Sequence, residues 1–313
     1  MVSGKRKVIV IGGSNVDITG TPDTELVSGD SNPGGVSISA GGVGRNIAEN
    51  AARLGLPVSL ISAVGDDYFG GYLKSVCRQA GIDTENIITD NSRSTSAYLC
   101  IMDGRDDLAA AVSDMKITET LSPELISSMK PLISGAAIVI IDNNIRPAAI
   151  EAVKAAGANR ILFDAVSGKK LRRSIDAVCD IDTVKLNAIE AEILSGVPVN
   201  STTDAERAAD IIRKRNIEHV FITLGAAGAF YSCRQGNWTA APYPLAVKNI
   251  TGAGDAFLAG IAYGHYNGTS GQDLLNIGTA CAAAAAASEK TVSDKINPEL
   301  IKQIITGGMN ELQ

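Results

Sequence analysis

Short apolar runs alternate with amphipathic stretches along most of the chain. Residues 7–11, 58–63 and 137–141 are apolar over the length of a buried strand. Residues 47–54 instead place apolar side chains at helical spacing, on one face. Strands that alternate with helices form βαβ units. The pattern therefore predicts an α/β fold in three layers, with a parallel sheet between helices on both faces.

The same alternation continues to the C-terminal end. Pro123 after Ser122 is typical of a helix start, and Thr203 with Glu206 predicts a capping box for a helix that runs to Arg215. Further strands are predicted at 160–163, 183–186, 219–223 and 229–232, and further helices at 67–80, 146–156, 188–194, 252–266, 271–287 and 297–306.

Two segments break this alternation and predict a second, smaller sheet. Residues 18–40 are rich in Gly, Ser, Asp and Pro, and residues 94–115 contain two strand-like runs around a hairpin signal at 103–107. We expect one domain over residues 1–313 with these strands inserted as a lid. A sheet this small is marginal alone, so it should close over a substrate, pack on a second subunit, or do both.

Composition narrows the possible environments and partners. Hydrophobic residues make up 45% of the chain and aromatics 4%, which predicts a core of Ala, Ile, Leu and Val. The net charge of −6 argues against nucleic acid or an acidic membrane as a partner. Five cysteines without a C-x-x-C pair indicate buried thiols, and no apolar stretch has the length of a membrane span. We therefore expect a soluble, cytoplasmic protein.

One stretch near the C-terminal end carries the most specific chemistry. Asn249-Ile-Thr-Gly-Ala-Gly-Asp255 leads directly into an apolar helical run. Such a turn presents unpaired backbone N–H groups at a helix N-terminus, which stabilise an anion. An aspartate beside an anion is useful if it takes a proton from the group that attacks the anion. The stretch therefore indicates phosphoryl transfer with Asp255 as the base. The alternative is an ordinary Gly-rich turn whose Asp favours the helix dipole.

Polar residues near the N-terminal end suit a polyol. Asn15 and Asp17 follow the strand at 7–11, at the sheet edge where ligands bind in α/β folds. Gly41 and Gly42 permit close approach of the backbone, and Asn46 can bond a sugar hydroxyl. The alternative is a set of turn-forming residues. The glycine spacing matches neither a dinucleotide fingerprint nor a Walker P-loop.

Two further motifs lie at strand ends in the second half of the chain. Asn187 with Glu190 can hold Mg²⁺ through water molecules, although the same pair is also a capping box. Thr223-Leu-Gly225-Ala-Ala-Gly228 can line a nucleotide or simply join two strands. His219 and His265 stand in contexts typical of surface or packing residues, so no histidine triad is expected.

Together these motifs are more specific than any one of them. Residues 41–46 and 251–255 resemble, in order and spacing, the two signatures of the ribokinase-like (PfkB) carbohydrate kinase family. Asn187-x-x-Glu190 and Thr223-x-Gly225 lie between them, as in that family. The resemblance covers the whole chain. It implies a three-layer ribokinase-like fold with a β-lid that forms a homodimer contact, and transfer of the γ-phosphate of ATP, with Mg²⁺, to a primary hydroxyl.

The resemblance also assigns roles to individual residues. Asp255 would be the general base, and the backbone of residues 252–254 the anion hole. Asn187 and Glu190 would serve Mg-ATP. The remaining residues that it implies are Gly252, Ala253 and Gly254 in that hole, Asn15, Asp17, Gly41, Gly42 and Asn46 for the ribose, Thr223, Gly225 and Gly228 for the nucleotide, and Asn249 and Thr251 for K⁺.

The substrate is less narrowly defined. Residues 30–34, 42–46 and 113–115 are most similar to family members that phosphorylate the 5′-hydroxyl of pseudouridine. Thr95, Ser96 and Asp114 are the candidates for contacts to the base. Ribokinase-type members commonly have Lys at position 43 and many have Asp at 249, where this chain has Val43 and Asn249. Kinases of ribose, adenosine or another nucleoside remain alternatives, as does a non-catalytic sugar-binding regulator, which would not need Asp255.

Overall fold

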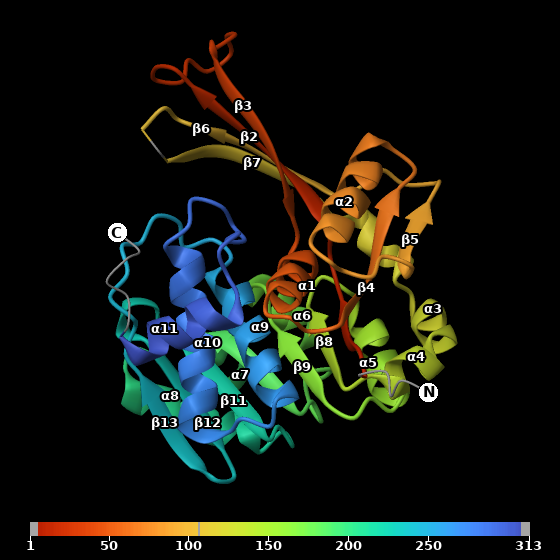
Figure 1. Ribbon diagram of the computed structural model, residues 1–313. Helices are drawn as coiled ribbons and strands as arrows, with labels where there is room; N and C mark the ends of the chain where they lie inside the picture. The colour runs from red at the N-terminus through yellow and green to blue at the C-terminus, as the bar shows by residue number, and fades with distance from the viewer. Residues whose placement is uncertain (1–5, 106, 308–313) are drawn as a thin grey trace.

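The central feature of the fold is a nine-stranded sheet. The computed structural model describes residues 6–105 and 107–307 (Figure 1). Within them the strands are parallel except for the antiparallel pairs that β12 makes with β11 and β13. In spatial order they are β13 (Gly236–Ala240), β12 (Ala229–Cys233), β11 (His219–Thr223), β10 (Thr183–Asn187), β9 (Ile161–Asp164), β8 (Ile138–Asp142), β1 (Val8–Ile11), β4 (Val58–Gly65) and β5 (Ile87–Asp90).

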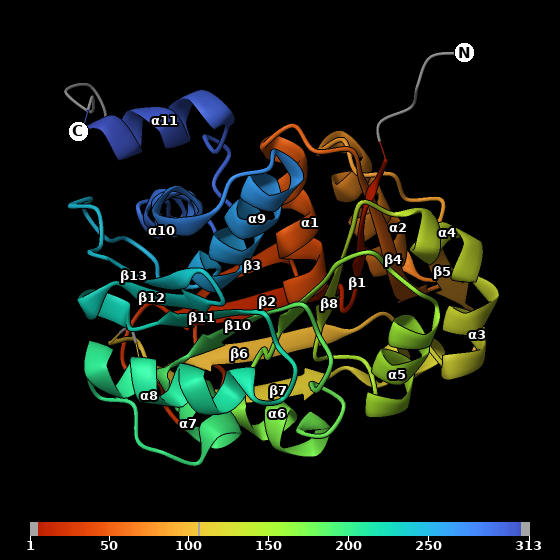
Figure 2. The same ribbon diagram turned by 90° about the horizontal axis from the view of Figure 1, so that it is seen from below.

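Helices cover both faces of this sheet, and each face has its own apolar core (Figure 2). None of the helices over the described ranges is long and apolar enough to cross a membrane. One face is covered by α1 (Val43–Arg53), α2 (Tyr68–Gln79), α9 (Ala253–Tyr266), α10 (Gly271–Ala286) and α11 (Pro298–Thr306). The other is covered by α3 (Pro123–Ser128), α4 (Lys130–Gly135), α5 (Pro147–Ala155), α6 (Gly168–Ser174), α7 (Ala188–Ser195) and α8 (Thr202–Arg213).

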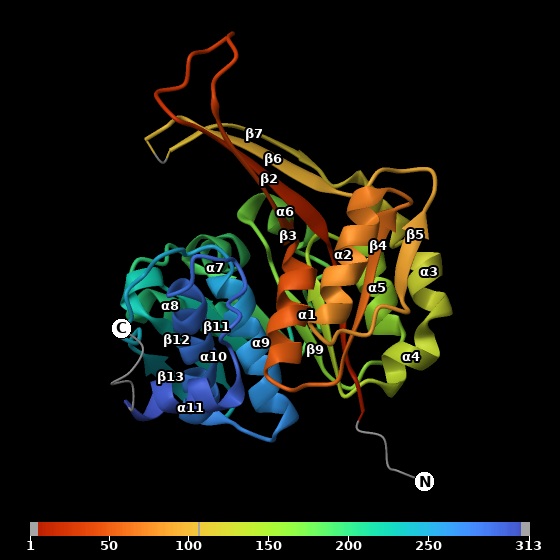
Figure 3. The same cartoon turned by 45° about the horizontal axis from the view of Figure 1, so that its top comes forward.

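A second, four-stranded sheet projects from this body (Figures 1 and 3). Its order is β3 (Gly34–Gly41), β2 (Asn15–Pro22), β6 (Ala97–Met102) and β7 (Leu108–Asp114). Two antiparallel pairs, β2 with β3 and β6 with β7, are joined by the parallel pair of β2 with β6. The predicted fold class, a three-layer α/β body with a small additional β-sheet, is thus confirmed.

Two predicted helix starts are wrong. The first helix begins at Val43 instead of 47, because Gly42 takes a left-handed φ of 99° and caps it at once. The later helix is capped by Ser201, whose hydroxyl accepts from the Asp204 amide at 3.2 Å, so the capping box predicted at Thr203 does not form. Both Ser201 and Thr203 can cap, and the local sequence does not separate them.

Several short elements were not predicted at all. They are β5, β13, α4, α6 and the 3₁₀ turns η1 (Lys116–Thr120) and η2 (Gly225–Ala227). Each is too short to develop a periodic pattern, and most are defined by the neighbours they pack against. The predicted hairpin turn at 103–107 joins β6 to β7, although its residue 106 lies outside the described residues.

A buried carboxylate at the end of β8 ties three segments together. Asp142 is fully buried and accepts from the backbone amides of Gly13 at 2.9 Å, Gly44 at 2.6 Å and Asn144 at 2.8 Å. These amides belong to the turn after β1, the start of α1 and the turn after β8. A Cβ on Gly12 would lie 2.5 Å from Oδ2 of Asp142. The absence of a side chain at Gly12 therefore makes this junction possible.

Two Gly→Ala substitutions should change stability in opposite directions. Gly12→Ala forces a methyl group against Asp142, so we expect the free energy of unfolding to fall by about 1–3 kcal/mol. Gly71→Ala, in α2 with nothing within 4 Å of its added Cβ, should raise it by about 0.5–1 kcal/mol through helix propensity. Urea denaturation measures both. A Gly12→Ala variant as stable as the wild type would contradict the packing described for Asp142.

Candidate active site

Polar residues gather where the parallel strands end. Asp142 ends β8, Asp164 ends β9, Asn187 ends β10 and Thr223 ends β11. Because these strands are parallel neighbours, their carboxyl ends meet at one edge of the sheet. The edge is where α/β folds bind ligands, and the first turns of α1 and α9 carry the two glycine-rich motifs toward it.

Asp255 and Asn46 meet at this edge although 209 residues separate them. Asp255 lies in the first turn of α9 and is only 8% exposed. Nδ2 of Asn46, in α1, donates a hydrogen bond of 2.8 Å to Oδ2 of Asp255. The structure therefore brings the N-terminal and C-terminal motifs into direct contact.

The turn before Asp255 has free amide donors. Gly252 caps α9 with a left-handed φ of 84°, and a Cβ there would overlap the carbonyl oxygen of Thr291. Among the described residues, the amides of Gly252, Gly254 and Asp255 have no acceptor, whereas that of Ala253 donates to the Ile250 carbonyl at 3.3 Å. Unpaired amides at a helix N-terminus can bind an anion. Gly252 and Gly254 have such amides, whereas the amide of Ala253, which was also predicted for the anion hole, is already bonded within the turn.

A buried lysine lies beneath this turn and was not predicted as a site residue from the sequence. Lys185, in β10, is 7% exposed, and its Nζ donates to Oδ2 of Asp164 at 3.0 Å. A Cβ on Gly254 would lie 2.6 Å from the same Nζ, so the ammonium group sits directly against the turn. Burial favours the neutral amine, but the carboxylates of Asp164, Glu190 and Asp255 outweigh it and raise the pKa of Lys185. The sequence signal that could have identified Lys185 is a single charged residue inside an otherwise uncharged strand.

The surroundings of Asp255 raise its pKa toward neutral pH. Burial and the Asp164 carboxylate favour its protonated form, while the bond from Asn46 and the charge of Lys185 favour its carboxylate form. The balance raises the pKa of Asp255 to about 7. A carboxylate in this range is half ionised near pH 7 and can accept a proton efficiently there.

The predicted substrate residues lie in the first half of β2 and at the junction between β3 and α1. Nδ2 of Asn15 donates to Oδ1 of Asp17 at 2.6 Å in β2, and burial raises the pKa of Asp17. A Cβ on Gly41 would lie 2.7 Å from Cγ of Asp17, and one on Gly42 would lie 2.7 Å from Cα of Ser14. Both glycines are therefore needed where the junction between β3 and α1 packs closely against β2 and the residues just before it.

The register of the second sheet separates two of the predicted residues. Asp17 pairs with Tyr98, and Tyr98 with Ser113, so these side chains share one face. Asp114 pairs with Ala97 and lies on the opposite face. It lines a separate cavity of about 470 Å³ with Ser92, Arg93, Ser94, Lys116 and Ile117. The structure thus does not bring Asp114 to Asp17, and Tyr98 and Ser113 are candidates that sequence reasoning missed.

Thr95 and Ser96 differ in what their hydroxyls contact. Thr95 Oγ1 donates to Asp67 at 2.7 Å and accepts from the Gly65 amide at 2.8 Å, so its one hydrogen is already used. Ser96 is 1% exposed, and its hydroxyl has no partner among the described residues. Thr95 therefore holds the start of α2, while Ser96 retains an unused donor.

The predicted nucleotide residues surround the ends of β10 and β11. Asn187 and Glu190 form a complete capping box, with bonds of 2.8 and 2.9 Å, and Glu190 is buried. The capping alternative is therefore realised, and a magnesium role for the same pair stays a prediction. Gly225 is open, with nothing within 4 Å of an added Cβ. Gly228 has a φ of 90°, and a Cβ there would overlap the carbonyl of Ala240.

The residues predicted for K⁺ are bonded to the chain itself. Oδ1 of Asn249 accepts from the Thr251 amide at 2.9 Å, and its Nδ2 donates to the Glu289 carbonyl at 3.2 Å. An aspartate at this position would offer no such donor. Its carboxylate would repel the carbonyl oxygen unless a cation lay between them.

The two histidines meet at the opposite edge of the sheet, where β10 and β11 begin. The ring centroids of His219 and His265 are 4.9 Å apart, and His219 bonds the Tyr231 hydroxyl at 2.8 Å. With Asp182 they are close enough together to hold a metal ion. However, the guanidinium of Arg160 already contacts both Asp182 and His265 and supplies a cation there. Both histidines thus have packing and hydrogen-bonding partners, far from Asp255 in the fold.

The comparisons with known proteins agree with this geometry. The model of the pfkB family of carbohydrate kinases matches residues 5–298. The chain belongs to this family. It is 33% identical to the pseudouridine kinase of Escherichia coli K12 over 299 residues, covering 95% of this chain and 94% of that protein. It is 26% identical to the guanosine-inosine kinase of Exiguobacterium acetylicum, with 90% and 95% covered.

Solved structures show the same fold. The ribokinase of Arabidopsis thaliana, in complex with ribose and ATP, superposes with a TM-score of 0.85 at 20% identity, over 96% of this chain and 99% of that one. A carbohydrate kinase from Agrobacterium tumefaciens superposes with a TM-score of 0.83 at 27% identity, over 96% and 97%. The fold is ribokinase-like, and family membership makes the protein a kinase of a sugar or nucleoside.

Proposed function

We propose that this kinase transfers the γ-phosphate of ATP to the 5′-hydroxyl of pseudouridine, with Asp255 as the general base. The observation that carries the proposal is the bond between Asn46 and Asp255 beside a turn with free amides. The residues that we assign to the sugar, the base and the anion would thus act side by side. The choice of pseudouridine is supported by the similarity to the Escherichia coli enzyme over almost the whole chain.

The substrate side of the mechanism depends on Asp17 and Asn46. The Asp17 carboxylate can accept hydrogen bonds from two ribose hydroxyls, and the Asn46 amide has one more N–H besides the one it gives to Asp255. Groups held this way place the 5′-hydroxyl at Asp255, which makes the attack effectively intramolecular. The base then takes the proton as the 5′-oxygen attacks the γ-phosphorus, and the bond from that phosphorus to the β-phosphate oxygen breaks, so that ADP leaves.

The phosphate side of the mechanism depends on positive groups at the turn. The amides of Gly252 and Gly254 and the ammonium of Lys185 face the position where negative charge builds up on the transferring group. Donors fixed in advance in a buried site stabilise such charge strongly. Lys185 was not indicated for this role by the sequence.

ATP and Mg²⁺ are proposed as co-substrate and cofactor. Asn187, Thr223, Gly225 and Gly228 would hold ATP, because they line the strand ends next to the turn. Glu190 fits a magnesium role in its chemistry, since one carboxylate oxygen bonds Asn187 and the other has no partner among the described residues. Bound Mg²⁺ would neutralise phosphate charge. Because Asn249 already satisfies the Glu289 carbonyl, we expect only a weak response to K⁺.

Recognition of the base would use the face of the second sheet that carries Asp17. Pseudouridine differs from uridine by a free N1–H, and a site that bonds this group rejects a nucleoside without it. The hydroxyls of Tyr98 and Ser113 share that face and can accept the bond. The second candidate function is a purine-nucleoside kinase, which the similarity to guanosine-inosine kinase favours.

A homodimer through the second sheet is also proposed. Its other face exposes Ile38, Leu99 and Val112, which share one face by register and are 51%, 43% and 67% exposed. A second copy would bury this row. We expect a dimer in sedimentation velocity, and a monomer for Val112→Glu, which adds a charge to the row. A wild-type monomer at micromolar concentration would contradict the proposal.

The function is tested by ATP turnover against pseudouridine, uridine, guanosine, adenosine, ribose and fructose 6-phosphate. We expect pseudouridine to be preferred, and Asp255→Asn to lower kcat by about 10²–10⁴, the usual contribution of a general base. The matched control is Asp273→Asn, an exposed aspartate in the first turn of α10, which should leave kcat unchanged.

Each outcome of this assay bears on one part of the proposal. A preference for guanosine or ribose would overturn the assignment of pseudouridine as the substrate but not that of Asp255 as the base. An Asp255→Asn variant with the wild-type rate would overturn the base. No turnover of any compound would favour the sugar-binding regulator.

A further inference from the structure

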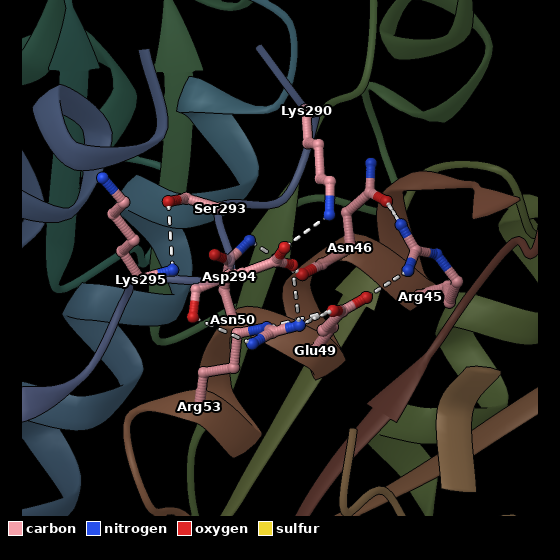
Figure 4. A network of polar contacts seen from close by, with 9 residues as sticks. All are labelled: Arg45, Asn46, Glu49, Asn50, Arg53, Lys290, Ser293, Asp294 and Lys295. Carbon is pink, nitrogen blue, oxygen red and sulfur yellow. Dashed lines mark hydrogen bonds and ion pairs between the residues drawn. The ribbon is translucent and has the colours of Figure 1, made fainter. Parts of the chain in front are cut away.

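A buried arginine next to Asn46 has no role in the mechanism described so far. Arg45 lies in the first turn of α1 and is 2% exposed. Its Nε donates to the Gly41 carbonyl at 3.1 Å. One terminal NH₂ group contacts the side-chain oxygen of Asn46, and the other contacts the carboxylate of Glu49 (Figure 4). Its guanidinium therefore joins both ends of the first signature.

This contact decides which way the Asn46 amide points. Arginine only donates hydrogen bonds, so the atom of Asn46 that faces Arg45 must be the oxygen, Oδ1. The NH₂ group then points away from Arg45 and donates to Asp255. If the Asn46 amide were flipped, its NH₂ group would face an NH₂ group of Arg45. Its oxygen would then face the carboxylate oxygen of Asp255.

We propose that Arg45 is a positioning residue for phosphoryl transfer, which locks Asn46 with its NH₂ group toward Asp255 and so fixes the catalytic carboxylate. The inference rests on the proposed function of Asp255. It adds a residue that touches neither substrate nor the reacting atoms and acts through Asn46.

The charges around Asp255 show why this donor matters. Burial and the charges of Asp164 and Asp142 raise the pKa of Asp255, whereas the Asn46 amide and the charge of Lys185 lower it. Without the Asn46 bond, the base would be protonated over more of the neutral range. Arg45 also affects Asp17, the carboxylate that we propose for the ribose. Burial raises the pKa of Asp17, and the positive charge of Arg45 opposes this rise.

Glu49 holds the guanidinium in place. It is 6% exposed, and its other oxygen accepts from Nε and an NH₂ group of Arg53 at 3.0 and 2.7 Å. A lysine at position 45 carries the charge but lacks the planar fork that reaches Gly41, Asn46 and Glu49 together. The network continues outward from Arg53 to Asp294 at 3.3 Å, where the Asp294 side chain is 56% exposed and the pair contributes little.

The test is a direct titration of Asp255 by carbon NMR in protein labelled at aspartate Cγ, with Asp255→Asn to assign the signal. In Arg45→Met the Asn46 amide is free to rotate. We expect the pKa of Asp255 to rise by about one unit, since a hydrogen bond to a charged group is lost. The Arg45→Lys variant should lie between wild type and Arg45→Met. In turnover, kcat near pH 7 should fall about tenfold for Arg45→Met, and the nucleoside KM should rise.

Two further variants separate positioning from folding. Glu49→Gln keeps Arg45 but weakens its anchor, so the pKa of Asp255 should shift in the same direction by a smaller amount, even if Arg45→Met does not fold. In an Asn46→Ala background, Arg45→Lys should no longer move the pKa of Asp255. Asp294→Asn, at the exposed end of the same network, should change neither the pKa nor kcat.

The outcomes distinguish this inference from the proposed function. A pKa of Asp255 that is unchanged in Arg45→Lys and Glu49→Gln would overturn the role of Arg45, whatever the activity. The same shift from Arg45→Lys with and without Asn46 would show that Arg45 does not act through the amide. A wild-type rate in Asp255→Asn would overturn the proposed base instead, and the titration would still report whether Arg45 orients Asn46.

Discussion

The hydrogen bond from Asn46 to Asp255 is the constraint on which the site depends. It joins the first turns of α1 and α9, whose glycine-rich starts face the same edge of the central sheet. Gly42 and Gly252 have positive φ angles and no side chain, which lets both helices begin there without steric overlap. Because the two turns come from opposite ends of the sequence, their contact depends on the fold between them.

Burying so many charges is unfavourable unless each has a partner. Arg45 with Glu49 and Lys185 with Asp164 are two such pairs, each almost fully buried and each beside a residue assigned to chemistry. Asp142 is stabilised differently, by three backbone amides. At Asp255 one hydrogen bond and the Lys185 charge do not offset burial and its acidic neighbours, so its pKa is raised to about 7, and burial raises the pKa of Asp142 as well. A pKa shifted this far from its usual value is typical of functional sites.

The sequence predicts the sheet well and the site only in part. Apolar runs identify most strands of the parallel sheet, because buried parallel strands are almost continuously hydrophobic. Family resemblance assigned Asn46 and Asp255 to one site, but their direct contact was not predicted, since no local signal joins residues 209 positions apart. Lys185 was missed because a single Lys in a strand gives no hint of what it faces. The separation of Asp114 from Asp17 depends on strand register, which residue types do not define.

The pH dependence of the chemical step shows whether Asp255 acts as the base in phosphoryl transfer. The rate would be measured by rapid quench with saturating ATP and nucleoside, from about pH 5 to about pH 9. Since only the carboxylate accepts a proton, we predict a rate that rises with pH and levels off above an apparent pKa near 7. Asp255→Asn should lose this ionisation. The same pH dependence in Asp255→Asn, or a flat wild-type profile, would contradict the account.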